Sequence, residues 1–204
     1  MSRPDPARAL LDAVIAFYDG AVRGGDAGVT AMLAAVRAAL MHATPIAPSP
    51  APRVIAASTL LNAALPETAL AARIAQAAPL FRWRQNPNYT TDSMGSAFMA
   101  NYGYVEFAGP KDALFRAADI RVGLLLLGPG LHYPLHAHPA EEIYYPLTES
   151  GLWRRGDESW RAVPAGQAIH HTPMMPHETK ATDGTLLALY CWRGDTVTEA
   201  RLTV

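Results

Sequence analysis

The residue pattern of the chain changes near residue 80, and this change limits the folds that are open to it. Up to about Pro79 the chain is rich in alanine, and its larger apolar residues recur at the three- and four-residue spacing of helices. From about Phe81, aromatic and β-branched residues replace alanine, and turn residues come at short intervals. We therefore predict an N-terminal helical region, residues 1–80, that packs on a mainly β domain, residues 81–204.

The N-terminal region carries start and stop signals for helices. Asp5 can cap a first helix, and Gly24-Gly25-Asp26 is typical of a stop followed by a new cap. A proline-rich stretch at 44–52 excludes a long helix there, and a further helical pattern at 60–78 is interrupted at Pro66. We expect two antiparallel helices followed by shorter ones.

The C-terminal region predicts many short strands separated by turns. Such a pattern indicates a double-sheet jelly roll or a small barrel, and barrels of this kind bind small ligands at their mouths. The expected strands are residues 97–107, 120–127, 133–137, 142–147, 151–155, 159–163, 167–171 and 186–192.

Two histidines, a glutamate and a tyrosine lie within nine residues of this β region. His136 and His138 share a face because residues two apart on a strand point the same way. A turn at 139–140 then leads to Glu142 and Tyr144, which share a face by the same period. Three ionisable groups buried on one inward face are costly without a cation. The pattern therefore predicts a metal site that keeps positions open for substrate.

A fourth ligand should come from a distant strand, because a barrel brings distant strands together. His177, just after a proline turn, is the best candidate. His170 or His171 could replace it if the register differs, but these neighbours point to opposite faces, so at most one can approach the site. His132 has the strand parity of His136 and is a candidate for substrate binding, although the turn beside it favours a structural role.

Composition restricts the partners and the compartment. The 17 Lys and Arg nearly balance the 18 Asp and Glu, so nothing favours nucleic acid or an anionic membrane, and a small molecule is the expected partner of a monomer or homodimer. Cys191 has no intrachain mate for a disulfide. No secretory signal precedes the helices, and the longest apolar run, 122–127, is far short of the ~20 residues that cross a bilayer. We expect a soluble, cytoplasmic protein.

Two segments resemble the motifs of a known superfamily. Gly130-x5-His136-x-His138-x3-Glu142 resembles the first cupin motif, and the stretch from Gly166 to His177 resembles the second, with one residue fewer between proline and histidine. Within the cupins, the string from Tyr133 to Tyr144, YPLHAHPAEEIY, is similar to the dimethylsulfoniopropionate lyase family, in particular its Q type. The N-terminal helical region, the late histidine and a tryptophan after it, Trp192, extend the resemblance.

The resemblance implies a cupin double-stranded β-helix, that is, a jelly-roll barrel, preceded by helices. It also implies one divalent metal ion on His136, His138, Glu142 and His177, with Tyr144 as catalytic base and substrate handling by a further tyrosine, Tyr133. The family reaction removes the α-proton of dimethylsulfoniopropionate and releases dimethyl sulfide and acrylate. Such a ligand set accepts Fe, Zn, Mn, Co or Ni, so the sequence does not choose the metal.

Each tyrosine can take part in this reaction only under one condition, which concerns the pKa of Tyr144 and the orientation of Tyr133. The ordinary pKa of tyrosine, ~10, leaves it protonated at neutral pH, and only a cation beside Tyr144 would favour its phenolate. Tyr133 has odd parity relative to His136 and turns away from the metal unless Pro134 disturbs the strand.

The sulfonium end of such a substrate calls for aromatic faces. Cation–π attraction contributes ~0.5 to 2 kcal/mol. Trp192 is the first candidate, and Trp83, Tyr89, Tyr102 and Tyr104 are further ones, although an aromatic residue in a β region more often belongs to the core.

Two alternatives stay open at the level of sequence. The same metal cupin could be an oxygenase or isomerase for another small carboxylate, with only weak lyase activity, because one fold hosts many chemistries. A non-catalytic, ligand-binding cupin is the second alternative, but no helix-turn-helix with a basic face and no appended domain supports it.

Overall fold

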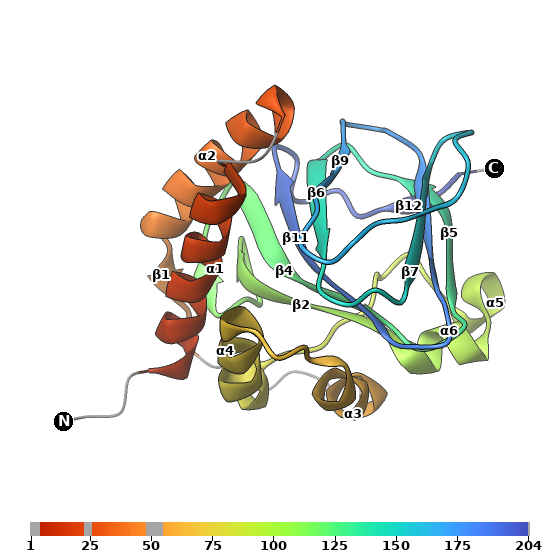
Figure 1. Ribbon diagram of the computed structural model, residues 1–204, viewed down its shortest axis with the longest axis horizontal. Coiled ribbons are helices and arrows are strands. Elements are labelled where there is room, and N and C mark those ends of the chain that lie inside the picture. The colour runs from red at the N-terminus through yellow and green to blue at the C-terminus, as the bar shows by residue number, and fades with distance from the viewer. Residues whose placement is uncertain (1–4, 23–25, 48–54, 204) are drawn as a thin grey trace.

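The protein consists of two facing β-sheets with helices against one of them (Figure 1). The computed structural model describes residues 5–22, 26–47 and 55–203, and only the backbone at 55–58. The helices in this part of the chain are α1 (Pro6–Val22), α2 (Ala27–Met41), α3 (Ile55–Ala64), α4 (Ala69–Ala77), the 3-10 helix η1 (Ala78–Leu80), α5 (Thr91–Met94) and α6 (Ser96–Asn101). None of these helices is both long enough and apolar enough to cross a membrane.

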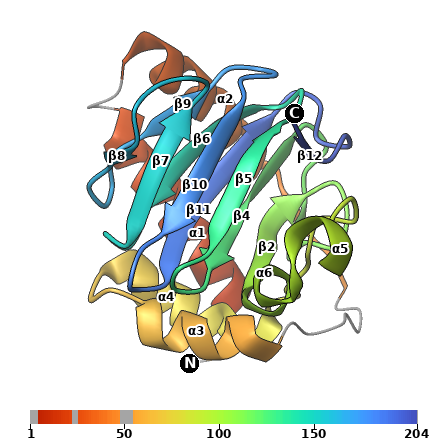
Figure 2. The same ribbon diagram turned by 90° about the vertical axis from the view of Figure 1, so that its right-hand side faces the viewer.

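The strands of the described residues form a seven-stranded sheet in the order β1-β3-β2-β4-β11-β6-β9 and a five-stranded sheet in the order β12-β5-β10-β7-β8. Figure 2 shows the five-stranded sheet in front. Their bounds are β1 (Thr44–Pro45), β2 (Tyr102–Gly109), β3 (Phe115–Arg116), β4 (Ile120–Leu127), β5 (His132–Ala137), β6 (Glu141–Pro146), β7 (Gly151–Arg155), β8 (Arg161–Ala162), β9 (Ile169–His171), β10 (His177–Ala181), β11 (Leu186–Arg193) and β12 (Arg201–Leu202).

Helices α1 and α2 lie side by side against the seven-stranded sheet (Figure 1). The apolar stripe predicted for the first helix is buried there, and Asp26 caps α2 by accepting a hydrogen bond from the backbone N–H of Val29 at 2.9 Å. The expected helix stop at 24–25 lies outside the described residues. The later helical pattern begins earlier than predicted, at Ile55, and is interrupted at Pro66 as expected.

The central strands of the seven-stranded sheet are buried on both faces, because their side chains alternate between two clusters. Along β4, Leu124 and Leu126 pack in one cluster with the helices, whereas Leu125 and Leu127 pack between the sheets. The second cluster is the interior of the barrel, and it contains the tyrosines and tryptophans singled out in the sequence, apart from Trp83, which lies in the cluster with the helices.

The first predicted strand, 97–107, is partly wrong, because α6 takes its first residues and β2 begins at Tyr102. Thr90 and Ser93 form a reciprocal capping box that starts α5, and Gly95, with φ of 84°, turns the chain into α6. Helix signals in short polar segments therefore outweigh the β-rich composition around them.

Two other strands are shorter than predicted, and one is not predicted at all. The strands expected at 159–163 and 167–171 shrink to β8 and β9, because a turn at 164–167 separates them. The sequence does not predict β10, whose residues, HETKA, lack apolar alternation. This strand nevertheless lies in the middle of the five-stranded sheet, between β5 and β7. At the edge of that sheet, β12 pairs with β5.

Candidate metal centre and its pocket

An irregular register between β5 and β10 decides which side chains face the interior. His136 lies opposite His177, but Tyr133 lies opposite Thr179, so β5 takes three residue steps where β10 takes two. The extra residue reverses the inward and outward faces of β5 next to Pro134. Tyr133 therefore turns inward, where its ring stacks on that of His136 at 3.9 Å. The sequence allows Tyr133 to face the metal only if Pro134 disturbs the strand, and this irregular register meets that condition.

The same irregularity turns His132 outward. Its side chain is 43% exposed, and its Nε2 lies 2.6 Å from Oε2 of Glu178 on the outer face of the five-stranded sheet. Trp160 lies beside it, with the ring centroids 5.8 Å apart. The structure thus does not bring His132 into the pocket, where the substrate-binding prediction had placed it.

Three buried histidines are held in one tautomer by the backbone. In His136, His138 and His177 the ring Nδ1 lies 2.7, 3.0 and 2.8 Å from a carbonyl oxygen two residues away along the chain. A carbonyl oxygen can only accept, so each Nδ1 carries a hydrogen, and in the neutral ring Nε2 presents a lone pair. Metal-ligating histidines are commonly oriented in this way.

The lone pairs of two of these rings meet a carboxylate. Oε2 of Glu142 lies 3.1 Å from Nε2 of His138 and 3.1 Å from Nε2 of His177. The Nε2 atom of His177 is buried and makes no hydrogen bond with the described residues. Acceptors that face one another in a buried place repel unless a proton or a cation lies between them. A divalent metal ion fits this arrangement of donor atoms.

Burial and charge act in opposite directions on this cluster. Burial favours the neutral carboxyl of Glu142, but the histidine rings around it, His138 first, hold the pKa of Glu142 well below its usual range. Burial lowers the pKa of His136 well below its usual value, and that of His171 to about 3. A carboxylate among neutral imidazoles is the protonation state in which such groups bind a metal.

The structure brings three of the four predicted ligands together, with His136 beside them. The candidate ligand atoms of His138, Glu142 and His177 all lie within 4.8 Å of one another. The ring of His136 is next to them, 4.2 Å from the ring of His177 between centroids. A divalent ion could therefore be held by residues from β5, β6 and β10 and from the turn after β5.

A fifth residue of the cluster is His171, which the sequence left as an alternative ligand. Its ring stacks on that of His177 at 4.0 Å, and its Nδ1 lies 3.3 Å from Oε2 of Glu142. His170 points away, with Nε2 2.9 Å from Oε1 of Glu141. Of these two adjacent histidines, only His171 approaches the site, as strand alternation requires.

Tyr144 is buried next to this cluster. Its ring centroid lies 5.9 Å from that of His171 and 6.4 Å from that of His177. Burial first, and then the negative charge of Glu142, raise the pKa of Tyr144 well above its ordinary value. The protein by itself therefore disfavours the phenolate, and a cation close to the phenol oxygen is needed to reverse this direction.

A pocket of about 380 Å³, counting its opening to solvent, adjoins the cluster. Glu142, Tyr144 and Tyr133 form part of its wall, so one candidate ligand and both tyrosines face one space. Tyr89 reaches the back of this wall, since its hydroxyl oxygen is 3.1 Å from that of Tyr133. The remaining lining residues are Asn86, Tyr102, Tyr104, Arg121, Leu125, Tyr190, Trp192, Glu199 and Ala200.

Trp192 lines the pocket but has partners in the protein that the sequence did not indicate. Its Nε1–H donates to Oε1 of Glu142 at 2.5 Å, and its ring stacks on His138 at 4.1 Å. Arg121 lies over the same ring, with Cζ 5.2 Å from the centroid. The proposed attraction between Trp192 and a sulfonium group therefore stays a prediction that must compete with these contacts.

The facing sheets, with a histidine and carboxylate cluster between them, define the protein as a cupin. It belongs to the dimethylsulfoniopropionate lyase family, whose model matches residues 26–188.

Known relatives agree with this assignment. The dimethylsulfoniopropionate lyase DddQ of Ruegeria pomeroyi is 32% identical over 125 residues, which make up 60% of this chain and 59% of DddQ. This alignment thus spans less than two thirds of either protein. The crystal structure of DddQ from the same organism matches with a TM-score of 0.68 and 26% identity, covering 91% of this chain and 97% of that one.

A second structure shows that the likeness in fold extends to the N-terminal helices. A crystal structure from work on the DMSP lyases RdDddP and RnDddQII matches with a TM-score of 0.73 and 24% identity. It covers 97% of this chain and the whole of the other.

Proposed function

We propose that the protein cleaves dimethylsulfoniopropionate to dimethyl sulfide and acrylate at one divalent metal ion held by His136, His138, Glu142 and His177. The observation that carries the proposal is the buried group of His138, Glu142 and His177, whose ligand atoms lie within 4.8 Å of one another and whose imidazoles are oriented by backbone carbonyls. Family membership and the name of the relative DddQ supply the substrate.

A bound divalent ion supplies a Lewis acid that stabilises the charge developing on the substrate carboxylate, an effect of several kcal/mol. Tyr144 would act as the phenolate, the form that a cation close to its oxygen favours, and accept the α-proton there. The electron pair of the broken C–H bond forms the new double bond, and the carbon–sulfur bond breaks. Because the sulfur takes the electrons of that bond, dimethyl sulfide leaves as a neutral molecule and needs no general acid.

The rest of the pocket would position the substrate and exclude water. Tyr133 offers its phenol group to a substrate bound near the candidate ligands. Its ring stacks on His136, and its hydroxyl shares a hydrogen bond with that of Tyr89. The aromatic rings of Tyr102, Tyr104 and their neighbours offer faces to the sulfonium end.

The base is tested by changing Tyr144 to Phe. We expect kcat to fall by about 10²- to 10⁴-fold, the contribution of a positioned general base, while the metal content and substrate binding are kept. Tyr145→Phe is the matched control, because this neighbouring tyrosine faces the helices and contacts Phe17 at 5.1 Å. A Tyr144→Phe enzyme with the normal rate would exclude Tyr144 as the base.

The reaction is tested by loading the purified protein with each candidate metal and measuring dimethyl sulfide. We expect turnover that a chelator removes and that one of Fe, Zn, Mn, Co or Ni restores. Elemental analysis of the isolated protein then identifies the native metal. A metal-loaded protein that releases only traces of dimethyl sulfide would instead indicate another small carboxylate as the substrate.

The cellular setting is part of the same proposal. A zwitterionic small molecule is the only partner that the pocket calls for, and the free, buried Cys191 is compatible with the reducing cytoplasm. Light scattering of the purified protein distinguishes a monomer from a homodimer.

A further inference from the structure

Four polar or aromatic residues form one row across the seven-stranded sheet. Arg121 on β4 lies opposite Trp192 on β11, and Trp192 lies opposite Glu142 on β6. Glu142 in turn lies opposite His171 on β9. Side chains that are directly opposed on neighbouring strands are close enough to interact, so the row connects a candidate metal ligand with groups well outside the cluster.

Each step of this row is a specific contact. The indole N–H of Trp192 donates to Oε1 of Glu142 at 2.5 Å. The other oxygen, Oε2, faces His138, His177 and the Nδ1 of His171 at 3.1 to 3.3 Å. One oxygen of the buried carboxylate is thus occupied by the tryptophan, and the other is left to the ligand cluster.

The tryptophan ring is itself fixed between two groups. It stacks on His138 with ring centroids 4.1 Å apart and planes 29° apart, and Cζ of Arg121 lies 5.2 Å from its centroid. A cation over an indole is attracted to the ring, draws electron density from it and makes its N–H a stronger donor. Arg121 therefore both holds the ring and strengthens its hydrogen bond to Glu142.

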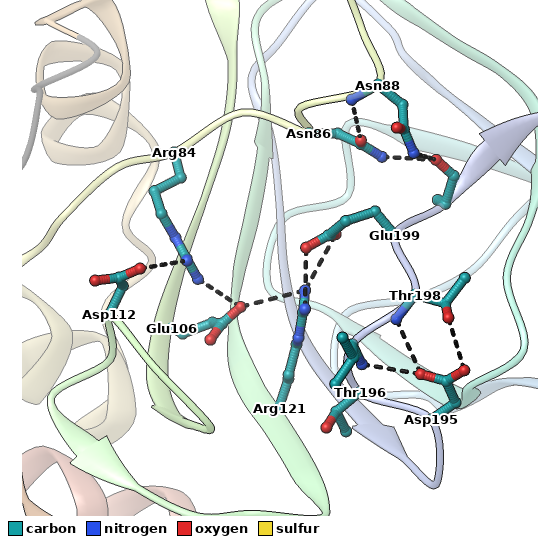
Figure 3. Close-up of polar contacts among 12 residues, drawn as sticks. Arg84, Asn86, Asn88, Glu106, Asp112, Arg121, Asp195, Thr196, Thr198 and Glu199 are labelled. Carbon is teal, nitrogen blue, oxygen red and sulfur yellow. Dashed lines mark hydrogen bonds and ion pairs between the residues drawn. The ribbon is translucent and has the colours of Figure 1, made fainter.

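Arg121 belongs to a chain of buried charges of alternating sign, shown in Figure 3. Its guanidinium contacts both carboxylate oxygens of Glu199, at 2.9 and 3.1 Å, and Oε1 of Glu106 at 3.5 Å. Glu106 is in turn paired with Arg84 at 2.6 Å. The side chain of Arg121 is only 5% exposed. Held by two carboxylates, Arg121 stays over the indole without needing a ligand to place it.

We infer that Trp192 is a positioning residue that makes Glu142 a one-oxygen ligand of the metal, and that Arg121 and its ion pairs hold Trp192 in place. The inference rests on the metal site of the proposed function. With Oε1 accepting from the indole, Oε2 is the oxygen that faces the ligand cluster, so a bound ion would be held through Oε2 in preference to both oxygens. Such binding would leave a coordination position for the substrate.

The test is Trp192→Phe, which keeps an aromatic ring for the stack and removes the N–H donor. Loss of an outer-shell partner costs metal ligands about 10- to 100-fold in affinity, so we expect the Kd for Co²⁺, measured by competition with a chelator, to rise by that factor. We also expect the visible spectrum of bound Co²⁺ to change, because the freed oxygen of Glu142 raises the coordination number. Trp83→Phe, in the other cluster, is the control and should alter neither.

A second variant tests the support of the ring. Arg121→Lys keeps the charge but loses the planar fork that contacts Glu199, so a smaller rise of the Kd for Co²⁺ is expected. If circular dichroism shows that this variant is unfolded, Glu199→Gln, which loosens the same contact, takes its place and should act in the same direction.

The outcomes separate this inference from the proposed function. If the unchanged protein binds no Co²⁺, both fall. If it binds Co²⁺ and Trp192→Phe binds with the same affinity and spectrum while only KM rises, Trp192 serves the substrate and the positioning role is excluded.

Discussion

The two sheets of this protein are built differently, although both contribute to the candidate metal centre. The central strands of the seven-stranded sheet are buried on both faces, by the helices on one side and by the barrel interior on the other. The five-stranded sheet has one face in contact with water, where it carries His132, Trp160 and Lys180. It also supplies two of the four proposed ligands, His136 on β5 and His177 on β10.

The two sheets therefore have different roles in the protein. The covered sheet contributes most of the buried apolar surface, and with it stability, whereas the open sheet contributes ligand geometry. Because metal ligands need the support of neighbouring strands rather than a large core, the open sheet can carry polar strands such as β10. Four experiments test whether stability depends mainly on the covered sheet and metal binding on the open sheet. They are given in order of decreasing effect.

The largest effect is expected for His177→Ala in the open sheet. The Kd for the metal should rise by more than about 100-fold, the upper end of the cost of losing only an outer-shell partner, and lyase activity should disappear with it. Metal titration measures the Kd, and urea unfolding of the metal-free protein measures its unfolding free energy. We expect the metal-free stability to fall by less than for a buried leucine, because the loss of ring packing on His171 is partly offset by removal of an unsatisfied lone pair. A large loss of metal-free stability would contradict the contrast.

The second change is Leu124→Ala in the covered sheet, on the face toward the helices. Removing a fully buried leucine side chain costs about 2 to 5 kcal/mol of unfolding free energy, while the folded fraction should bind metal as before. Leu152→Ala, at a half-buried position of β7, is the matched control and should cost far less. Equal losses at the two positions would show that the sheets do not differ in this respect.

The third change is the addition of metal to the purified protein. Ligand that binds only the folded state at 100 times its Kd stabilises it by about 2.7 kcal/mol, which thermal unfolding detects as a higher Tm. The gain should persist in Leu124→Ala and be absent in His177→Ala. A gain that survives the loss of His177 would place the ion elsewhere.

The smallest effect is expected for Lys180→Ala on the water-exposed face. Its ammonium lies 4.3 Å from the centroid of the Trp160 ring, and exposed cation–π pairs contribute about 0.5 to 1 kcal/mol. Urea unfolding should show a loss within that range, with metal affinity and turnover unaltered. A change in metal affinity would mean that the outer face of β10 controls the position of His177.

The sequence predicts the grouping of the candidate ligands better than it predicts the bounds of the strands around them. His136, His138 and Glu142 are close in the chain, so the two-residue period of strands and one turn are enough to aim them at a common point. The family motif then adds His177. The roles of these residues remain predictions, but the structure does place the candidate ligand atoms of His138, Glu142 and His177 within 4.8 Å of one another.

Other parts of the site depend on information that local patterns do not contain. The extra residue in β5 reverses the parity of His132 and Tyr133, and only Pro134 gives a sign of it. The row from Arg121 to His171 depends on the register of four strands that are distant in sequence. The polar strand β10 and the short helices before β2 likewise gain their structure from partners and caps rather than from apolar spacing.

The pairing of β12 with β5 affects the order in which the site can form. Leu202 lies opposite His136, and the backbone N–H of Thr203 donates to the carbonyl oxygen of Leu135, so the last described strand borders the strand that carries the first ligand. During synthesis on the ribosome, the ligand-bearing strand must therefore wait for more than sixty further residues before its free edge is covered. Until then, any ion captured by the early histidines would be held by an incomplete barrel.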